Sequence, residues 1–288
     1  VVVIHQFISE SKPLISYKWS TSIRNNKNTL NDALWFLLPS IPVKKPWQMP
    51  ITWRELFDVC NDLGVDIAGW LHSELTKNKI FGKATHLLLG FPVEQFIGKG
   101  FERIHWFVAE FKYPKKSFQG FRNNSNNLFR VLTNIMFREG EKIRWLRSEN
   151  WAKDQITARG KLDKTLSDYN ILLIGAGAIG SCMSEMLLRL GCEKIKIVDS
   201  DNLSVGNFSR HTLRMDSLPQ LKASELGKKL NLIFPFAEVS FETKTLQDCI
   251  DVNTDFLNSF DLIIDASAND LVLKVIEEKL INHNLVIV

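Results

Sequence analysis

The sequence has few cysteines and no long apolar run. Its four cysteines lie far apart, and no pair has the two-residue spacing of a zinc knuckle. This pattern fits neither a disulfide framework nor a structural zinc site, so a reducing cytoplasm is the expected compartment. No stretch of 18 or more apolar residues occurs, which excludes a membrane-spanning helix. The sequence starts at Val1 without a methionine or a signal-peptide pattern, and we therefore expect it to begin inside a longer protein.

Tryptophan is missing from the second part of the chain. All eight tryptophans lie between Trp19 and Trp151. The balance of charge changes at nearly the same place, since residues 1–165 hold 25 Lys and Arg against 15 Asp and Glu, whereas residues 166–288 hold 11 against 17. The overall net charge of +4 therefore conceals a basic part and an acidic part. We predict two domains, 1–165 and 166–288.

The second part alternates short apolar runs with segments of helical period. Strands are predicted at 170–174, 194–198, 237–242, 261–265 and 285–288. Helices are predicted at 178–190, 219–232, 246–260 and 271–282. Repeated strand–helix alternation predicts a Rossmann-like, doubly wound parallel sheet of the α/β class. Because the chain stops on the last predicted strand, we expect its carboxyl end to be truncated as well.

The first part reads as an α+β domain without a motif that indicates chemistry. Thr52 and Glu55 form a capping box at the start of a helix that runs to Cys60. Further strands are predicted at 87–92 and 104–111, and further helices at 127–139 and 141–156. The basic stretches of this part are interpreted as a solvated face, and we expect no nucleic-acid partner.

A glycine-rich turn lies between the first strand and the first helix of the second part. Its sequence is Gly175-Ala-Gly177-Ala-Ile-Gly180. Glycines let backbone amides approach a phosphate or a ribose, and the helix N-terminus favours negative charge. The alternative is a tight strand–helix turn without a ligand. The strand before the turn and the helix after it favour a nucleotide site.

Acidic and basic side chains follow the second strand in a fixed order. Asp199 and Asp201 come first, Asn207 and Arg210 lie in the next loop, and Lys222 follows early in the next helix. An acid at the end of the second strand suits ribose hydroxyls. Together with the glycines, this order resembles the ThiF/MoeB superfamily, which includes the activating enzymes of ubiquitin-like proteins. The resemblance covers residues 166–288 and implies a glycine turn, Asp-x-Asp, Asn-x-x-Arg and a helix lysine that bind ATP.

The resemblance implies an adenylation reaction, in which a carboxylate attacks the α-phosphorus of ATP and pyrophosphate leaves. A carboxylate is already ionised at neutral pH, since its pKa is about 3.5, so it needs no general base. Fixed cations are needed to bring an anion to a polyanion. By resemblance, Arg210 and Lys222 would bind the phosphates and act as the catalytic residues. Asp199 would hold the ribose, and Asn207 would help fix the phosphate end. A solvated loop charge and an exposed helix lysine remain the alternatives for the two cations.

One position departs from the pattern of the superfamily. The family carries Asp-x-x-Asp-Asn after the fourth strand, with the second Asp serving Mg²⁺, whereas here the segment Asp265 to Asn269 has Ala268 at that position. Either another acid serves the metal, such as Asp201 or Asp270, or ATP and water hold it. A third interpretation is a degenerate domain that binds nucleotide without catalysis. The metal ligand is therefore left open.

Activating enzymes also use a cysteine to accept the acyl group, and the family expectation places it beyond the end of this sequence. The four cysteines present, Cys60, Cys182, Cys192 and Cys249, are interpreted as small buried hydrophobic residues. An arginine before the first strand reaches across a dimer in the superfamily, and Arg147 and Arg159 are candidates by position alone.

The leading interpretation is an ATP-dependent adenylyltransferase acting on the C-terminal carboxylate of a ubiquitin-like protein or peptide. The layout resembles bacterial fusion proteins in which an N-terminal region precedes a ThiF-like module, and the family implies a homodimer. An NAD-dependent oxidoreductase is the first alternative, although a dinucleotide site has no use for the cations Arg210 and Lys222. A non-catalytic nucleotide-binding or dimerisation module is the second alternative.

Overall fold

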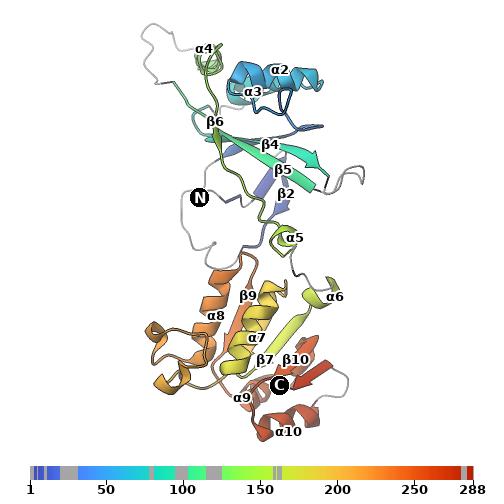
Figure 1. The fold of residues 1–288 in the computed structure, drawn as a ribbon, viewed down its shortest axis with the longest axis vertical. Helices are drawn as coiled ribbons and strands as arrows, with labels where there is room; N and C mark the ends of the chain where they lie inside the picture. The colour runs from blue at the N-terminus through green and yellow to red at the C-terminus, as the bar shows by residue number, and fades with distance from the viewer. Residues whose placement is uncertain are drawn as a thin grey trace. The chain divides into compact units, whose positions relative to one another are not determined.

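The computed structural model describes residues 3–4, 6–9, 12–19, 32–77, 81–94, 103–114, 125–157, 160, 164–279 and 284–287. The chain forms two compact units (Figure 1). One unit consists of residues 28–150, and the other combines residues 1–27 with residues 151–288. The first 27 residues thus associate with the later part of the chain, and the division at 1–165 and 166–288 stays a prediction about domains.

The acidic part contains a five-stranded parallel sheet in the order β11-β10-β7-β8-β9. Its strands are β7 (Asn170–Ile174), β8 (Lys194–Val198), β9 (Glu238–Glu242), β10 (Leu262–Asp265) and β11 (Asn284–Ile287). Numbered along this unit, the order is 5-4-1-2-3, the doubly wound arrangement predicted from the sequence. The order reverses between β7 and β10, so ligands are expected at the carboxyl ends of these strands.

Helices cover both faces of this sheet. They are α7 (Ala178–Arg189), α8 (Lys222–Ile233), α9 (Leu246–Val252) and α10 (Asp270–Lys279). Ile171 and Leu173 of β7 pack in one core with residues of α7 and α8, whereas Leu172 and Ile174 pack in a second core with residues of α9 and α10. Because both faces of the central strand β7 are covered, its residues Ile171 to Ile174 are all apolar and buried.

Several helix boundaries differ from the prediction. The helix predicted from residue 219 begins at Lys222, three positions later, and the helix predicted over 246–260 ends at Val252. A short 3₁₀ helix, η3 (Leu257–Ser259), follows instead. Gly191 lies just past the end of α7 with φ +104°. The left-handed region that Gly191 adopts is easily reached only by glycine.

The early residues of this unit pack on it through aromatic rings. They include the antiparallel hairpin of β1 (Gln6–Ser9) and β2 (Lys12–Ser16). Trp19 is buried, stacks on Phe236 with 5.1 Å between ring centroids and meets Trp151 edge to face. Its indole Nε1 donates to the Ile4 carbonyl at 3.0 Å. Two short helices, α5 (Lys153–Ile156) and α6 (Lys164–Ser167), precede β7.

The other unit is a two-layer α+β domain. Its mixed sheet has the order β3-β4-β5-β6. The strands are β3 (Ala33–Leu37), β4 (His86–Val93), β5 (Arg103–Glu110) and β6 (Arg144–Leu146), and the helices are α2 (Trp53–Asp62), α3 (Ile67–Lys77) and α4 (Ser125–Met136). One core joins the helices to the sheet, with Leu87 and Leu89 of β4 against Leu56 and Leu71. The predicted capping box of Thr52 and Glu55 is confirmed.

One predicted helix of this unit is wrong. Residues 141–156 do not form a single helix, because Arg144–Leu146 pair with β5 as strand β6 and only Lys153–Ile156 are helical. Trp145 pairs with Ala109 in this ladder. A hydrogen-bonded strand partner 36 positions away overrides the local helical preference of the segment.

Candidate nucleotide-binding site

The glycine-rich turn joins β7 to α7, and its three glycines do not all have the same structural role. Gly175 has φ +91°, and a Cβ added there would lie 2.7 Å from the Ala266 carbonyl oxygen. A Cβ on Gly180 would lie 1.9 Å from the Gly175 carbonyl oxygen. A Cβ on Gly177 would have nothing within 4 Å among the described residues. Two glycines therefore allow close packing, whereas Gly177 leaves the helix N-terminus open to a ligand.

Asp199 follows β8 and is held by backbone amides. Its carboxylate accepts from the Ala176 N–H at 2.6 Å and from the Asp201 N–H at 2.7 Å. The first bond ties the end of β8 to the glycine-rich turn, because Ala176 lies inside that turn. A half-buried carboxylate fixed in this way has oxygens left to accept hydrogen bonds from vicinal hydroxyls, as a ribose presents them.

Asn207 lies in a loop before α8 and has a structural task. It ends the short 3₁₀ helix η1 (Val205–Asn207), and its side-chain oxygen accepts from the N–H and the hydroxyl of Ser204 at 2.9 and 3.0 Å. Its backbone carbonyl accepts from the N–H groups of Arg210 and His211. Asn207 thus shapes the loop that carries Arg210, and only its amide nitrogen is available for the predicted contact with phosphate.

The two predicted cations have different surroundings. Arg210 is exposed, and within the described ranges its guanidinium makes no hydrogen bond or ion pair. Lys222 is the first residue of α8, is 8% exposed, and its Nζ lies 2.8 Å from Asp201 Oδ2. The Lys222 N–H also donates to the Asp201 carbonyl at 2.9 Å. The pair of predicted residues Asp201 and Lys222 therefore meets directly, whereas Arg210 is a cation without a counterion in the described structure.

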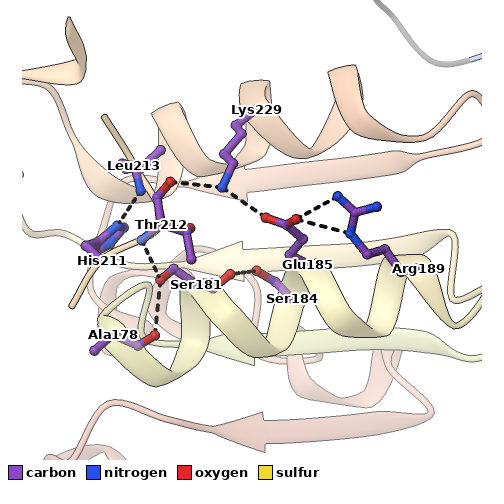
Figure 2. Close-up of polar contacts among 9 residues, drawn as sticks. All are labelled: Ala178, Ser181, Ser184, Glu185, Arg189, His211, Thr212, Leu213 and Lys229. Carbon is purple, nitrogen blue, oxygen red and sulfur yellow. Dashed lines mark hydrogen bonds and ion pairs between the residues drawn. The ribbon is translucent and has the colours of Figure 1, made fainter. Parts of the chain in front are cut away.

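His211, the residue after Arg210, was missed by the sequence analysis. It is 8% exposed, and its Nε2 lies 2.6 Å from the Ala176 carbonyl oxygen of the glycine-rich turn. Its Nδ1 accepts from the Leu213 N–H at 3.1 Å, as Figure 2 shows. Burial lowers the pKa of His211 below its usual value of 6.5, chiefly by desolvation, although the bond to Ala176 opposes this effect. The only sequence signal for this residue is its place beside the loop arginine.

Figure 2 also shows how the same loop is attached to two helices. The Thr212 carbonyl accepts from Lys229 Nζ of α8 at 2.9 Å, and Lys229 pairs with Glu185 of α7 at 3.0 Å. Glu185 also pairs with Arg189 at 2.8 Å, and the hydrogen bonds of these two cations lower the pKa of Glu185. The loop that presents Arg210 is therefore held by contacts to the glycine turn, α7 and α8.

The segment after β10 lies against the glycine-rich turn and carries the departure from the family pattern. Asp265 is 4% exposed, and its carboxylate accepts from the N–H and the hydroxyl of Ser267 at 2.9 and 2.7 Å. Ala268 is exposed with φ +53°, a region that Asn and Asp adopt more readily than alanine. No group of three or more His, Cys, Asp or Glu side chains that could hold a metal occurs among the described residues. The described residues thus form no cluster that would hold Mg²⁺ without a nucleotide.

The cysteines are mostly core residues, as predicted. Cys60 is fully buried, and desolvation raises the pKa of its thiol to about 11, which makes it a poor nucleophile at neutral pH. Cys192 and Cys249 are also buried. The prediction was wrong for Cys182, which is exposed on α7. Its position follows from the helical period, since the neighbouring Ser181 takes the inward-facing place.

The candidate arginines before β7 stay predictions. Arg147 is exposed in the unit of residues 28–150 and pairs with Glu149 at 2.8 Å. Arg159 lies outside the described residues.

No helix in the described part of the chain has the length and apolar character needed to cross a bilayer.

Two protein families match the chain, one after the other. Residues 1–151 match the Cap2 central linker domain, and residues 150–285 match the ThiF family. The chain is 37% identical over 282 residues to an ATP-dependent ubiquitin transferase-like protein Cap2 from Enterobacter hormaechei, covering 94% of this chain and 46% of that protein. A Cap2 protein from Pseudomonas aeruginosa is 35% identical over 111 residues, covering 37% of this chain and 19% of that protein.

Among solved structures, the E. coli tRNA N6-threonylcarbamoyladenosine dehydratase TcdA in complex with ATP is similar at 25% identity and a TM-score of 0.40. The match covers 49% of this chain and 61% of that protein.

The chain spans less than half the length of the curated Cap2 proteins named above. With its Cap2 central linker domain followed by a ThiF family domain, the chain belongs to the superfamily of ThiF, MoeB and ubiquitin-activating enzymes.

Proposed function

We propose that the chain is part of an ATP-dependent adenylyltransferase that activates the C-terminal carboxylate of a ubiquitin-like protein or peptide. The observation that carries the proposal is the exposed Arg210 without a counterion, on a loop fixed to the glycine-rich turn. A free cation beside an open helix N-terminus attracts a polyanion such as ATP. The kinship with ATP-dependent ubiquitin transferase-like proteins supports the same reaction class.

In the proposed reaction the substrate carboxylate oxygen forms a bond to the α-phosphorus of ATP. The bond from that phosphorus to the β-phosphate oxygen breaks, and pyrophosphate leaves with its electron pair. Arg210 and Lys222 stabilise the negative charge on the phosphates, and Asp199 orients the ribose. Lys222 reaches this role from its pair with Asp201, whose exposed carboxylate keeps the ammonium in one position. No general base is required, because the carboxylate is ionised at neutral pH.

The partners of the proposed enzyme follow from the same reaction. A carboxylate substrate would come from a ubiquitin-like protein or a peptide. We propose that the enzyme is a homodimer and that it acts in the cytoplasm. The domains are proposed at 1–165 and 166–288, with the first serving partner recognition and the second carrying ATP chemistry. The thioester cysteine of such enzymes would be supplied outside the four cysteines of this sequence.

A non-catalytic nucleotide-binding module is the second candidate, and Ala268 favours it. The segment after β10 has no carboxylate at position 268, where the family carries Asp. The Asp265 carboxylate already accepts hydrogen bonds from Ser267. We propose that Mg²⁺, where it takes part, arrives with the nucleotide and is held by phosphate and water. The alternative of an NAD-dependent oxidoreductase is disfavoured by the free charge of Arg210, for which a dinucleotide site has no use.

ATP–pyrophosphate exchange separates these candidates. The protein is incubated with ATP, labelled pyrophosphate and candidate ubiquitin-like proteins or peptides with free C-termini. Label returning to ATP only when a carboxylate substrate is present supports adenylation. ATP binding measured by calorimetry without exchange for any substrate supports the non-catalytic module and contradicts the enzyme. Binding of NAD in preference to ATP contradicts both.

Replacing Ala268 by Asp should make nucleotide binding depend more strongly on Mg²⁺. The left-handed backbone at φ +53° tolerates aspartate, so the fold should not suffer. Without the metal, the new carboxylate repels phosphate and should weaken ATP binding by about tenfold, which corresponds to ~1.4 kcal/mol. With Mg²⁺ it gains an oxygen ligand and should recover that loss. Calorimetry of ATP binding without and with Mg²⁺ measures the loss of affinity and its recovery.

Ala268→Asn is the matched control for this substitution, because it has nearly the same shape and the same backbone preference but no charge. The effect of Mg²⁺ on its ATP affinity should be about the same as in the unsubstituted chain. Equal metal dependence of the Asp and Asn variants would contradict the view that residue 268 lies near the phosphates.

A further inference from the structure

His211 connects the loop of Arg210 to the glycine-rich turn through both ring nitrogens. A backbone N–H can only donate, so the Leu213 N–H at 3.1 Å requires an unprotonated Nδ1. The proton of the neutral ring therefore lies on Nε2, which donates to the Ala176 carbonyl at 2.6 Å. The geometry thus selects one tautomer of neutral histidine.

Two hydrogen bonds hold one residue of the glycine-rich turn, Ala176. Ala176 is held from one side by His211 at its carbonyl and from the other by Asp199 at its N–H. The residue before His211 is Arg210, and both of their N–H groups donate to the Asn207 carbonyl. The two ring bonds of His211 therefore restrain the segment of backbone from which Arg210 extends.

We propose that His211 is a positioning residue that, in its neutral form, holds Arg210 beside the glycine-rich turn and makes phosphate binding decline at mildly acidic pH. This inference rests on the proposed function. Protonation would place a second N–H on Nδ1, facing the N–H of Leu213. Two donors cannot bond to each other, so the loop would lose one of its two ties through this ring.

The surroundings of His211 favour the neutral ring. It is buried, and the positive side chains of Lys222 and Lys229 from α8 oppose protonation, whereas Asp199 after β8 favours it. Burial is the largest of these effects, and the net result is a pKa below 6.5. A lowered pKa means that the contribution of neutral His211 is complete above pH 6.5 and is lost as pH falls through the folded-state value.

ATP binding to the full chain is measured by calorimetry at pH 7.5 and pH 5.5, with Mg²⁺ present throughout. The variants are His211→Gln, which places an amide donor near the position of Nε2 and does not titrate, and His211→Ala, which removes both bonds. His72→Gln on α3, in the unit of residues 28–150, is the matched control. The nucleotide's own phosphates also titrate near pH 6, but this effect is common to all variants.

Between the two pH values the unsubstituted chain should lose more affinity than His211→Gln, by a factor that stays below about tenfold because the pKa of His211 lies below 6.5. At pH 7.5, His211→Gln should bind ATP within about threefold of the unsubstituted chain, and His211→Ala about tenfold more weakly. His72→Gln should reproduce the unsubstituted chain at both pH values. An equal pH dependence in the unsubstituted chain and His211→Gln would overturn the proposal.

A second measurement separates this proposal from the proposed function. Imidazole nitrogen NMR of the free protein at pH 7.5 reports the tautomer without any nucleotide. A neutral ring with the proton on Nε2, titrating below pH 6.5, is expected. A proton on Nδ1 or a charged ring at neutral pH would overturn the positioning role even where ATP binds. An absence of ATP binding with the expected tautomer would overturn the proposed function instead.

Discussion

Arg210→Ala should reduce the rate of ATP–pyrophosphate exchange by about 100- to 1,000-fold, the loss that follows removal of one charge-stabilising donor, ~2.7–4 kcal/mol. The reason is that Arg210 is exposed and makes no ion pair in the described structure, so its charge is free for the phosphates. Because Arg210 is exposed and its guanidinium makes no ion pair among the described residues, the substitution should leave the unfolding temperature within about 2 °C of the parent. Exchange assays and thermal unfolding of the same preparations measure the two expectations.

Arg214→Ala is the matched control, since it removes an arginine from the same loop. Arg214 is exposed but already pairs with Asp216, and its guanidinium donates to that carboxylate. It should therefore retain exchange within about threefold of the parent. Activity surviving in Arg210→Ala, or an equal loss in both variants, would show that the phosphate site has been assigned wrongly. A lower unfolding temperature in Arg210→Ala would indicate a structural role that the described contacts do not include.

The parallel sheet could be predicted because each of its strands can be recognised from the sequence of its own segment. Strand Asn170–Ile174 is a short apolar run, whereas Lys194–Val198 alternates lysine with buried isoleucine, and the bounds of both matched the prediction. The first α+β unit was harder, because strand Arg144–Leu146 exists only through pairing with β5. Strand β3 and helix α3 were not predicted at all. A sheet partner far along the chain leaves no trace in local periodicity.

The site could be predicted in its residue types but not in its connections. The order of Asp201 and Lys222 along the sequence did not reveal that their side chains form an ion pair at 2.8 Å. Nor did it reveal that the Asn207 side chain is used by Ser204. His211 escaped because its importance comes from Ala176, 35 positions away. Motif spacing records which groups can meet a ligand, whereas the contacts that hold those groups depend on the folded loop.

Gly180→Ala should destabilise the domain by about 3 kcal/mol, at the upper end of the cost of overpacking. The added Cβ would lie 1.9 Å from the Gly175 carbonyl oxygen, and a backbone atom cannot rotate away as a side chain can. Helix α7 would have to move from the glycine-rich turn. The unfolding temperature, followed by circular dichroism, should fall by roughly 10 °C, and ATP binding should be lost with the geometry of the turn.

Gly177→Ala is the informative partner of this substitution, because a Cβ there meets nothing within 4 Å among the described residues. The backbone, with φ −77°, accepts alanine, so the fold should lose less than about 1 kcal/mol. The methyl group would nevertheless project into the space where a phosphate approaches the helix N-terminus, and ATP affinity should fall by about tenfold. A stable protein with weakened binding for Gly177→Ala, beside an unstable one for Gly180→Ala, separates the glycine kept for a ligand from the glycine kept for packing. Unchanged ATP affinity in Gly177→Ala would mean that the nucleotide does not use this helix end.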